Sequence, residues 1–404
     1  MLGIVGSVAG CGKLNVPDPE ANRRDGEPIF DLKAVEHNQK SARIAARSQN
    51  EFGLKLLRVV AAQKPRENTF ISPTSVWMAL AMAEKGARGA AQTELQRVLA
   101  LQNGSDASVV ALRATLKAQG LKINLANALW ADKKVTFPPA FTQNNAKTFG
   151  ATAQTLDFRA KNSVGAINNW VKKQTEGEIS EILKKLPTSG AVLTNALYFR
   201  GRWQKPFQKS ETEAAPFYGP GKIETSVPLM NGEGFSSFGG ANFEGAILPY
   251  ANSSCELLAL LPNKGKTPLD VTANLDVDEL DAIESGAPTA LRLPRFMLDW
   301  DDSLVVPLRN LGLNTAFSQS ADWSAMGLPP TSFISEVLHK TRLKITEEGT
   351  VASAATAVVM QTGSAKAPEP KILVFDRPFV LLLRETHSRA ILFAGIVNDP
   401  QILP

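Results

Sequence analysis

A run of seventeen residues without a single charged side chain, residues 349–365, interrupts an otherwise polar part of this chain. It reads GTVASAATAVVMQTGSA and lies between the polar sequence ITEE and the proline-rich sequence AKAPEP, a setting typical of a surface loop. An apolar, strand-forming run in an exposed place is an aggregation hazard. The run therefore indicates a segment that is exposed at first and buried later.

Alternate residues of this run show what a strand made from it would present. Both faces of such a strand would be uncharged, so its insertion between two existing strands would bury no unpaired charge. Gly349 supplies a flexible hinge at the start. Taken alone, the run is equally compatible with an ordinary alanine-rich core strand or helix. The face that could enter a sheet over a hydrophobic core comprises Thr350, Ala352, Ala354, Thr356, Val358 and Met360.

Motifs along most of the chain resemble those of one protein family. The sequence EEGT (347–350), followed by ASAAT (352–356), resembles the proximal hinge of the serpins. The uncharged run begins within this motif. Matches elsewhere resemble the start of the family's second helix, its long central strand and its C-terminal strands. Together they extend over roughly residues 45–400. In chain order these motifs are NTFISPTS (68–75), NWV (169–171), QTEG (174–177), LTNALYFRGRWQKPF (193–207), LPRF (293–296), ISEVLHK (334–340), FDRPF (375–379) and LFAG (392–395).

The resemblance implies an α+β serpin fold, with about nine helices around three β-sheets and an exposed reactive-centre loop at about residues 347–371. The periodicity of the sequence agrees with this class. Helical spacing occurs early, at residues 42–62 for example, and strand-like apolar runs dominate from residue 192 onward. No linker-like stretch interrupts residues 45–400, so we expect a single domain, residues 41–404.

The resemblance also implies three groups of site residues. The hinge would comprise Glu347, Glu348, Gly349, Thr350, Ala352, Ser353, Ala354 and Ala355. A shutter beneath the central sheet would comprise Ser72, Ser75, Asn195 and His339. A breach at the top of the sheet, where the loop would first enter, would comprise Trp203, Arg295 and Glu347. An ion pair between Glu347 and Arg295 would hold the closed state, and a guanidinium offers two-pronged geometry for it.

Enzyme chemistry has little support in this sequence. There is no G-x-S-x-G, H-E-x-x-H or G-x-x-x-x-G-K-[ST] motif and no cysteine pair with metal-ligand spacing, so no enzyme activity, metal or cofactor is predicted. Of the three histidines only His339 lies in a strand-like setting, where a core histidine is the better interpretation. The formal net charge of +5 comes from scattered lysines and arginines, which predicts no nucleic-acid binding.

The N-terminal segment carries a second signal. Residues 1–11, MLGIVGSVAGC, end in VAGC, which resembles the lipobox of bacterial lipoprotein signal peptides, so we expect a signal peptide with lipid on Cys11. No basic residue precedes the apolar stretch, which a start codon assigned too late would explain; a frayed hydrophobic terminus is the alternative. Residues 12–40 are expected to be a flexible spacer. The protein would then be bacterial and extracytoplasmic, secreted or held at the cell envelope, with the lipid as its only membrane contact.

The function that the resemblance implies is suicide inhibition of a serine protease by a monomeric protein. The loop would be cut as a substrate, the protease held as an acyl-enzyme, and the freed segment inserted into the central sheet. In the family that the chain resembles, the reactive residue normally follows the hinge glycine at a set distance, which implies a cut between Gly363 and Ser364, with Thr362, Ala365 and Lys366 as alternatives. A small residue there favours elastase-like or subtilisin-like targets. One alternative is a non-inhibitory carrier, chaperone or protease substrate with the same fold. Another is a membrane-tethered hydrolase, which no nucleophile–base arrangement in the sequence supports.

Overall fold

Helices dominate the first half of the chain and strands the second half, as the periodicity predicts. The computed structural model describes residues 31–102, 105–119, 122–187, 190–350 and 371–403. No helix within these ranges is both long and apolar enough to cross a membrane. The nine α-helices of the described residues are α1 (Leu32–Gln63), α2 (Pro73–Glu84), α3 (Gly89–Val98), α4 (Ser105–Lys117), α5 (Pro139–Phe149), α6 (Ser163–Gln174), α7 (Pro268–Asn274), α8 (Val277–Asp281) and α9 (Val305–Asn310).

The first helix begins earlier than the sequence predicts. The Asp31 carboxylate accepts a hydrogen bond from the Ala34 backbone N–H at 3.0 Å, which caps α1, and Val35 is fully buried. Residues 32–40 therefore belong to α1, and the predicted spacer boundary at residue 40 is wrong. Apolar periodicity is weak there because part of the packing is polar: Gln39 and Arg43 both donate hydrogen bonds to the backbone oxygen of His387.

The central sheet contains six strands. β4 is buried along most of its length because both of its faces are covered. Leu193 and Leu197 face the main core with α2, whereas Val192 and Ala196 pack under α6. This double burial explains why β4 reads as a nearly continuous apolar run. The order across the sheet is β10 (Phe296–Ser303), β11 (Ile334–Ile345), β12 (Gly349–Thr350), β4 (Ala191–Arg202), β2 (Lys122–Asp132) and β3 (Thr152–Leu156).

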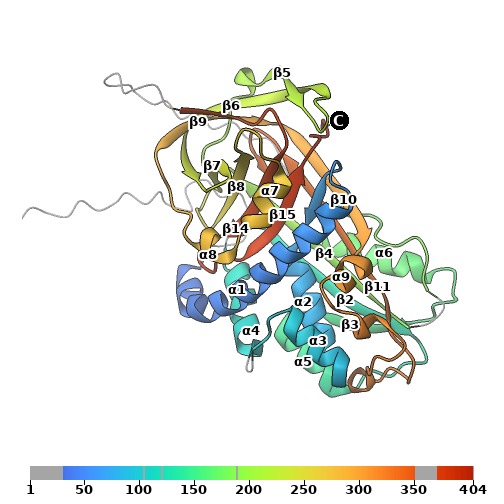
Figure 1. Cartoon of the computed structure of the whole chain (residues 1–404). Helices are drawn as coiled ribbons and strands as arrows, with labels where there is room; N and C mark the ends of the chain where they lie inside the picture. Colours follow the sequence, from blue (N-terminus) through green and yellow to red (C-terminus); the bar gives the residue numbers. More distant parts are fainter. Residues whose placement is uncertain (1–30, 103–104, 120–121, 188–189, 351–370, 404) are drawn as a thin grey trace, which may run out of the picture.

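The remaining strands form one sheet of nine, so the three expected sheets are hydrogen-bonded as two in the described residues. The order is β1 (Thr69–Ile71), β15 (Ile391–Val397), β14 (Phe379–Glu385), β8 (Cys255–Pro262), β7 (Phe243–Pro249), β6 (Glu224–Gly239), β9 (Pro288–Pro294) and β13 (Lys371–Val374), with β5 (Glu213–Tyr218) also paired to β6. The long strand β6 connects the two sides of this sheet. Residues 224–236 of β6 pair with β5 and β9, and residues 236–239 pair with β7. Figure 1 shows the β5–β6 hairpin at one end of the molecule and α3 and α5 at the other.

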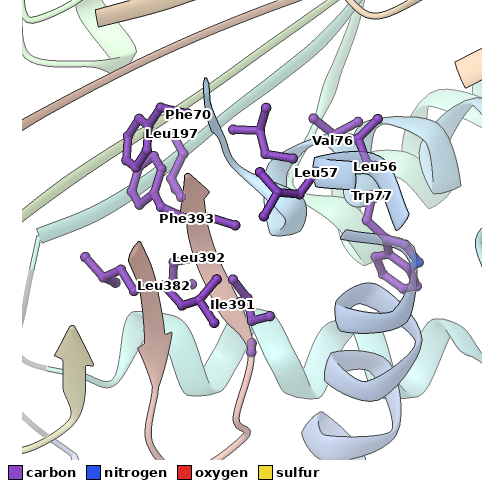
Figure 2. Close-up of a cluster of buried hydrophobic side chains, with 14 of the residues drawn as sticks. Leu56, Leu57, Phe70, Val76, Trp77, Leu197, Leu382, Ile391, Leu392 and Phe393 are labelled. Carbon is purple, nitrogen blue, oxygen red and sulfur yellow. The ribbon is translucent and has the colours of Figure 1, made fainter. Parts of the chain in front are cut away.

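The hydrophobic core lies between the two N-terminal helices and the C-terminal hairpin. Every residue of β14 and β15 is buried. Figure 2 shows Leu57 of α1 and Val76 of α2 directed toward the side chains of β15, and Phe393 beside Phe70. The last two rings are stacked with their centroids 5.0 Å apart. Because burying a side chain of this size contributes about 1.5–3 kcal/mol, this hairpin is a principal source of stability.

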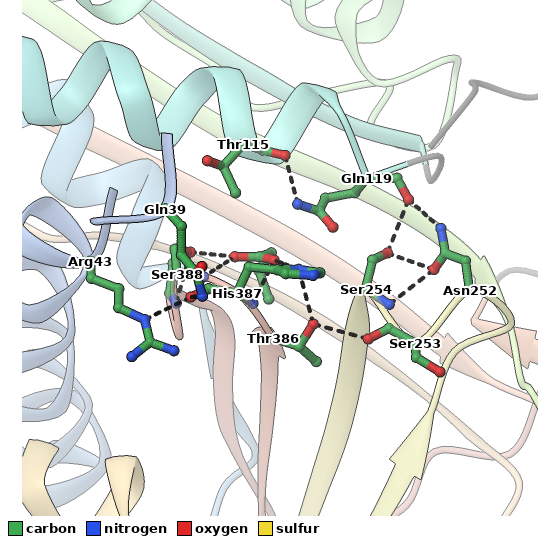
Figure 3. Close-up of polar contacts among 12 residues, drawn as sticks. Gln39, Arg43, Thr115, Gln119, Asn252, Ser253, Ser254, Thr386, His387 and Ser388 are labelled. Atoms are coloured by element: carbon green, nitrogen blue, oxygen red, sulfur yellow. Dashed lines mark hydrogen bonds and ion pairs between the residues drawn. The ribbon is translucent and has the colours of Figure 1, made fainter. Parts of the chain in front are cut away.

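The turn between β14 and β15 is held in shape by a buried carboxylate and is tied to its surroundings by further hydrogen bonds. Glu385 accepts hydrogen bonds from the backbone N–H of His387 at 2.8 Å and of Ser388 at 2.6 Å. The Thr386 hydroxyl donates to the Ser253 backbone oxygen at 2.9 Å, and α1 reaches the same turn through Arg43 (Figure 3). The turn therefore fixes α1 and the β7–β8 connection to the end of the core hairpin.

Helix α2 starts directly beneath the central sheet. The Ser72 side chain accepts a hydrogen bond from the Ser75 backbone N–H at 3.2 Å, and Pro73 occupies the first helical position, where its missing N–H costs nothing. Every residue of this helix is buried. The cap thus places Ser72 and Ser75 under the strands where the shutter was predicted.

Gly395→Ala should destabilise the fold, because an added Cβ would lie 2.6 Å from the backbone oxygen of Thr69. Since β1 pairs with β15 at this point, we expect a loss of about 1–3 kcal/mol. The control Gly165→Ala in α6 meets nothing within 4 Å and should stabilise the helix by roughly 1 kcal/mol. Guanidinium unfolding midpoints would then rise from Gly395→Ala through wild type to Gly165→Ala. An unchanged midpoint for Gly395→Ala would contradict the tight pairing of β1 with β15.

Candidate functional site

The predicted hinge forms a tight turn between β11 and β12. Thr346 and Gly349 exchange backbone hydrogen bonds at 3.0 and 3.3 Å, and the Thr346 hydroxyl also donates to the Gly349 oxygen at 2.9 Å. Gly349 has φ +150°, and a Cβ there would lie 2.3 Å from the Gly201 backbone oxygen. Only glycine satisfies both conditions, so this position is defined by backbone geometry and close approach.

The two residues of β12 already lie inside the central sheet. Gly349 and Thr350 pair antiparallel with Arg202 and Gly201 of β4, and Thr350 pairs with Ile345 of β11 on the other side. Thr350 is fully buried. The upper ends of β4 and β11 are thus separated by the first residues of the hinge.

Tyr250, which the sequence did not indicate, holds Thr350 in this position. Its hydroxyl lies 2.5 Å from the Thr350 hydroxyl. The ring stacks on Trp203, with centroids 4.6 Å apart, and meets Phe199 edge-on at 4.9 Å. Burial raises the pKa of Tyr250 well above its ordinary value of 10, so the phenol keeps its proton and can donate it in this hydrogen bond. A tyrosine at the end of an apolar strand is the only signal in the sequence, and it does not distinguish this role from packing.

The structure brings the three predicted breach residues together around the turn. Trp203 donates to the Glu348 backbone oxygen through its backbone N–H at 3.0 Å and to the Thr346 oxygen through its indole N–H at 2.9 Å. The carboxylate of Glu347 accepts a hydrogen bond from Thr212 at 2.9 Å and pairs with Arg295 at 3.3 Å. The ion pair uses one guanidinium nitrogen, so the two-pronged geometry offered by arginine is not adopted.

The second hinge carboxylate has its own partner at the rim. Lys209 lies 2.8 Å from Glu348 and, by hydrogen bonding to it, has its pKa raised above the ordinary value. Lys209 is mostly exposed, so water and salt screen this pair and its contribution to stability is small. Both glutamates are therefore held outside the sheet, at the point where the charged sequence gives way to the uncharged one.

The four predicted shutter residues also meet, with Asn127 of β2 as a fifth member that the sequence missed. The Ser72 backbone N–H donates to His339 Nε2 at 2.9 Å. The Ser75 hydroxyl and the Asn195 side-chain amide both donate to Asn127 Oδ1, at 3.1 and 2.8 Å. A polar residue on the inward face of an otherwise apolar strand was the available signal for Asn127.

His339 is neutral in this cluster. Burial lowers its pKa from 6.5 to about 3. Hydrogen bonding to the Asn195 backbone opposes this shift, but the effect of burial is larger. Since Nε2 accepts the Ser72 N–H, the ring proton resides on Nδ1.

Several predicted site residues lie outside the described ranges. They are the remainder of the hinge, the reactive bond with its alternatives, and the lipobox cysteine: Ala352, Ser353, Ala354, Ala355, Thr362, Gly363, Ser364, Ala365, Lys366 and Cys11. The described part of the site is a sheet opening at its upper end, occupied by two hinge residues, above a buried polar cluster between β4 and β11. Such an arrangement can accept a strand between β4 and β11.

The architecture is similar to that of solved structures, among them a serpin. The thermophilic serpin tengpin in its native state has a TM-score of 0.81 and 25% sequence identity, over 93% of this chain and 96% of that chain. A thyroxine-binding globulin complex with thyroxine has a TM-score of 0.79 and 25% identity, over 88% of this chain and 99% of that chain. These likenesses confirm the predicted serpin fold.

Sequence comparison leads to the same family. The family model described as serpin (serine protease inhibitor) matches residues 47–400. The leukocyte elastase inhibitor of Sus scrofa is 32% identical over 87% of this chain and 98% of its own length, and serpin B9 of Homo sapiens is 31% identical over 86% and 97%. This chain therefore belongs to the serpin family.

The neutral state of His339 predicts sensitivity to acid. In the unfolded chain histidine binds a proton below about pH 6.5, whereas the folded site resists protonation down to about pH 3. The resulting contribution to stability is fully present above pH 6.5 and is lost as the pH falls toward 3, by up to about 1.4 kcal/mol per pH unit. His339→Gln retains an acceptor for the Ser72 N–H and should lack this part of the slope. Urea unfolding at several pH values measures it, and parallel curves for the two proteins would refute the assignment.

Proposed function

We propose that this protein inhibits serine proteases by trapping them through insertion of its cleaved loop. The observation that carries the proposal is the position of β12: Gly349 and Thr350 are hydrogen-bonded between β4 and β11, and the sequence that follows them has no charge up to Lys366. A strand that has begun to enter a sheet and can continue without burying a charge favours insertion over any other fate for the loop.

The energetics are sufficient for such a trap. About fifteen inserted residues at roughly 3.3 Å each would carry an attached protease on the order of 50 Å. If each new backbone hydrogen bond contributes about 1 kcal/mol net, insertion releases on the order of 10 kcal/mol. Hydrolysis of the acyl-enzyme needs an intact triad and oxyanion hole, so distortion of the protease against the base of the inhibitor would leave the acyl bond uncut.

The proposed reactive bond is Gly363–Ser364, and the proposed targets are elastase-like or subtilisin-like serine proteases. The name of the porcine relative, leukocyte elastase inhibitor, is consistent with a target of the first kind. A non-inhibitory carrier is the second candidate, because a thyroxine-binding globulin shares the fold. Thr350 argues against it, since a small neutral side chain at the first buried hinge position leaves insertion unobstructed.

Thr350→Arg should convert the inhibitor into a substrate. The arginine would replace a fully buried side chain, and burying an unpaired charge would slow insertion below the rate of deacylation. On denaturing gels with an elastase-like protease, wild type should form a covalent complex and the variant should yield mainly cleaved protein. Thr93→Arg, at an exposed position on α3, is the matched control and should behave as wild type. Equal covalent complex with Thr350→Arg would refute the insertion mechanism, and none with wild type would favour the carrier.

The same reaction locates the reactive bond. Mass spectrometry of the C-terminal peptide released on complex formation should find a fragment that begins at Ser364. A fragment beginning at residue 367 would move the specificity to trypsin-like enzymes, because Lys366 would then precede the cut. A cut before residue 359 would leave too short a strand for trapping and would support the non-inhibitory reading.

We also propose that the protein is a bacterial lipoprotein tethered through Cys11. The support is the VAGC sequence at the end of an apolar segment. When it is expressed in a bacterium behind a start that supplies a basic n-region, it should partition into detergent and carry acyl chains on Cys11. Cys11→Ala should remain in the aqueous phase, and equal partitioning of the variant would exclude the tether.

A further inference from the structure

The turn between β7 and β8, residues 250–254, lies against the end of β4, because Tyr250 forms an antiparallel bridge with Trp203. The turn is tightly built. The backbone N–H of Ser253 donates to the Tyr250 oxygen at 2.8 Å, and the N–H of Tyr250 donates to the Cys255 oxygen at 2.9 Å. The Thr386 hydroxyl ties the Ser253 oxygen to the core hairpin at 2.9 Å. The turn therefore has a fixed shape and a fixed position on the core.

Two side chains of this turn bind the chain at the end of α4, just before β2 begins. The Gln119 backbone oxygen accepts hydrogen bonds from the side-chain amide of Asn252 and, at 3.0 Å, from the hydroxyl of Ser254 (Figure 3). Asn252 Oδ1 accepts the Ser254 N–H at 3.1 Å, so its Nδ2 is the atom that faces Gln119. Gln119 and Ser254 are fully buried. Carbonyl groups at a helix end lack partners within the helix, and here the turn supplies them.

The same turn also holds the end of β4 and the hinge. The backbone N–H of Ala251 donates to the Arg202 oxygen at 2.8 Å, and the Tyr250 hydroxyl lies 2.5 Å from the Thr350 hydroxyl. Within the central sheet Arg202 pairs with the first residue of β12, and the start of β2 lies opposite the end of β4. Five consecutive residues thus contact the chain entering β2, the end of β4 and the hinge, all at the same end of the central sheet.

We propose that Asn252 and Ser254 are positioning residues for the hinge, which hold Tyr250 where its hydroxyl binds Thr350. Without their hydrogen bonds the buried Gln119 oxygen would be unpaired, which is costly, so the turn would shift to relieve it. Because Tyr250 begins the turn, such a shift moves its hydroxyl away from Thr350. The consequence for inhibition rests on the proposed function: a hinge that has left the sheet must re-enter it before insertion can start.

Asn252→Asp tests the positioning role with almost no change in shape. The carboxylate keeps the acceptor for the Ser254 N–H but has no hydrogen to donate to the Gln119 oxygen. In hydrogen exchange measured by mass spectrometry, peptides covering residues 196–203 and 343–350 should exchange about five times faster than in wild type, as expected for the loss of one hydrogen bond. Thr267→Ala removes the capping box of α7 and is the control for a general loss of stability. It should leave these two peptides unchanged.

Variants of Ser254 test the second donor. Ser254→Ala should raise exchange in the same two peptides, whereas Ser254→Thr keeps the hydroxyl and should not. If neither Asn252→Asp nor Ser254→Ala changes exchange there, the positioning role is refuted. An equal rise throughout the molecule would refute it too, because the loss would then be one of general stability.

A second measurement tests the consequence for inhibition. With an elastase-like protease, the ratio of cleaved protein to covalent complex should rise about fivefold in Asn252→Asp, while the rate at which the intact inhibitor is consumed stays at the wild-type value. Faster exchange at the hinge without a change in this ratio would refute the positioning role in inhibition. If wild type itself forms no covalent complex, the proposed function fails, and the exchange measurement still decides whether the two side chains hold the hinge.

Discussion

The parallel pairing of β4 with β11 is the contact on which the rest of this structure depends. It pairs residues 337–340 of β11 with residues 193–196 of β4 and closes the central sheet below the hinge. Parallel pairs are slightly less stable per residue than antiparallel ones. This seam also lies over a polar cluster in which Asn127 Nδ2 and Asn195 Oδ1 have no partner among the described residues. The segment after α6 crosses it, because Glu176 pairs with Lys122 of β2 and Glu178 with Lys344 of β11. The seam is thus closed by interactions that are individually weak and can be exchanged for a strand.

The upper end of the seam separates what enters the sheet from what stays outside. Thr350 is hydrogen-bonded to the Tyr250 hydroxyl and pairs with Gly201 of β4. Gly349 lies so close to β4 that no side chain would fit there. One residue earlier the chain is charged, and Glu347 and Glu348 are held at the rim by Arg295, Thr212 and Lys209. Charge at the rim and its absence beyond Thr350 thus define where a strand can begin.

The sequence was sufficient to predict the fold class, the order of helices and strands, and most members of the site. Long motifs with residues far apart in the chain identified Ser72, Asn195, His339 and Trp203, and the structure brings these residues into the two clusters. The sequence did not identify Asn127 or Tyr250. Asn127 lies in β2 and Tyr250 directly follows β7, and both strands otherwise read as ordinary core. The start of α1 was missed for a related reason: its first turns are held by a side-chain cap and by hydrogen bonds to a distant turn, which leave no apolar period.

The positions of the buried polar atoms without hydrogen-bond partners in the described residues bear on how the molecule could store free energy and still be well folded. The core hairpin β14–β15 is completely buried, and its two strands contribute none of the buried side-chain atoms that lack a partner in the described residues. Asn195 Oδ1, one of several buried polar atoms without a partner in the described residues, lies at the seam between β4 and β11, whose register already matches that of a strand placed between them. Relief therefore requires only lateral separation of β4 from β11, whereas unfolding would require the loss of the whole core. Under the proposed insertion mechanism, a barrier to opening this seam, rather than the depth of the native minimum, would set the lifetime of the closed form.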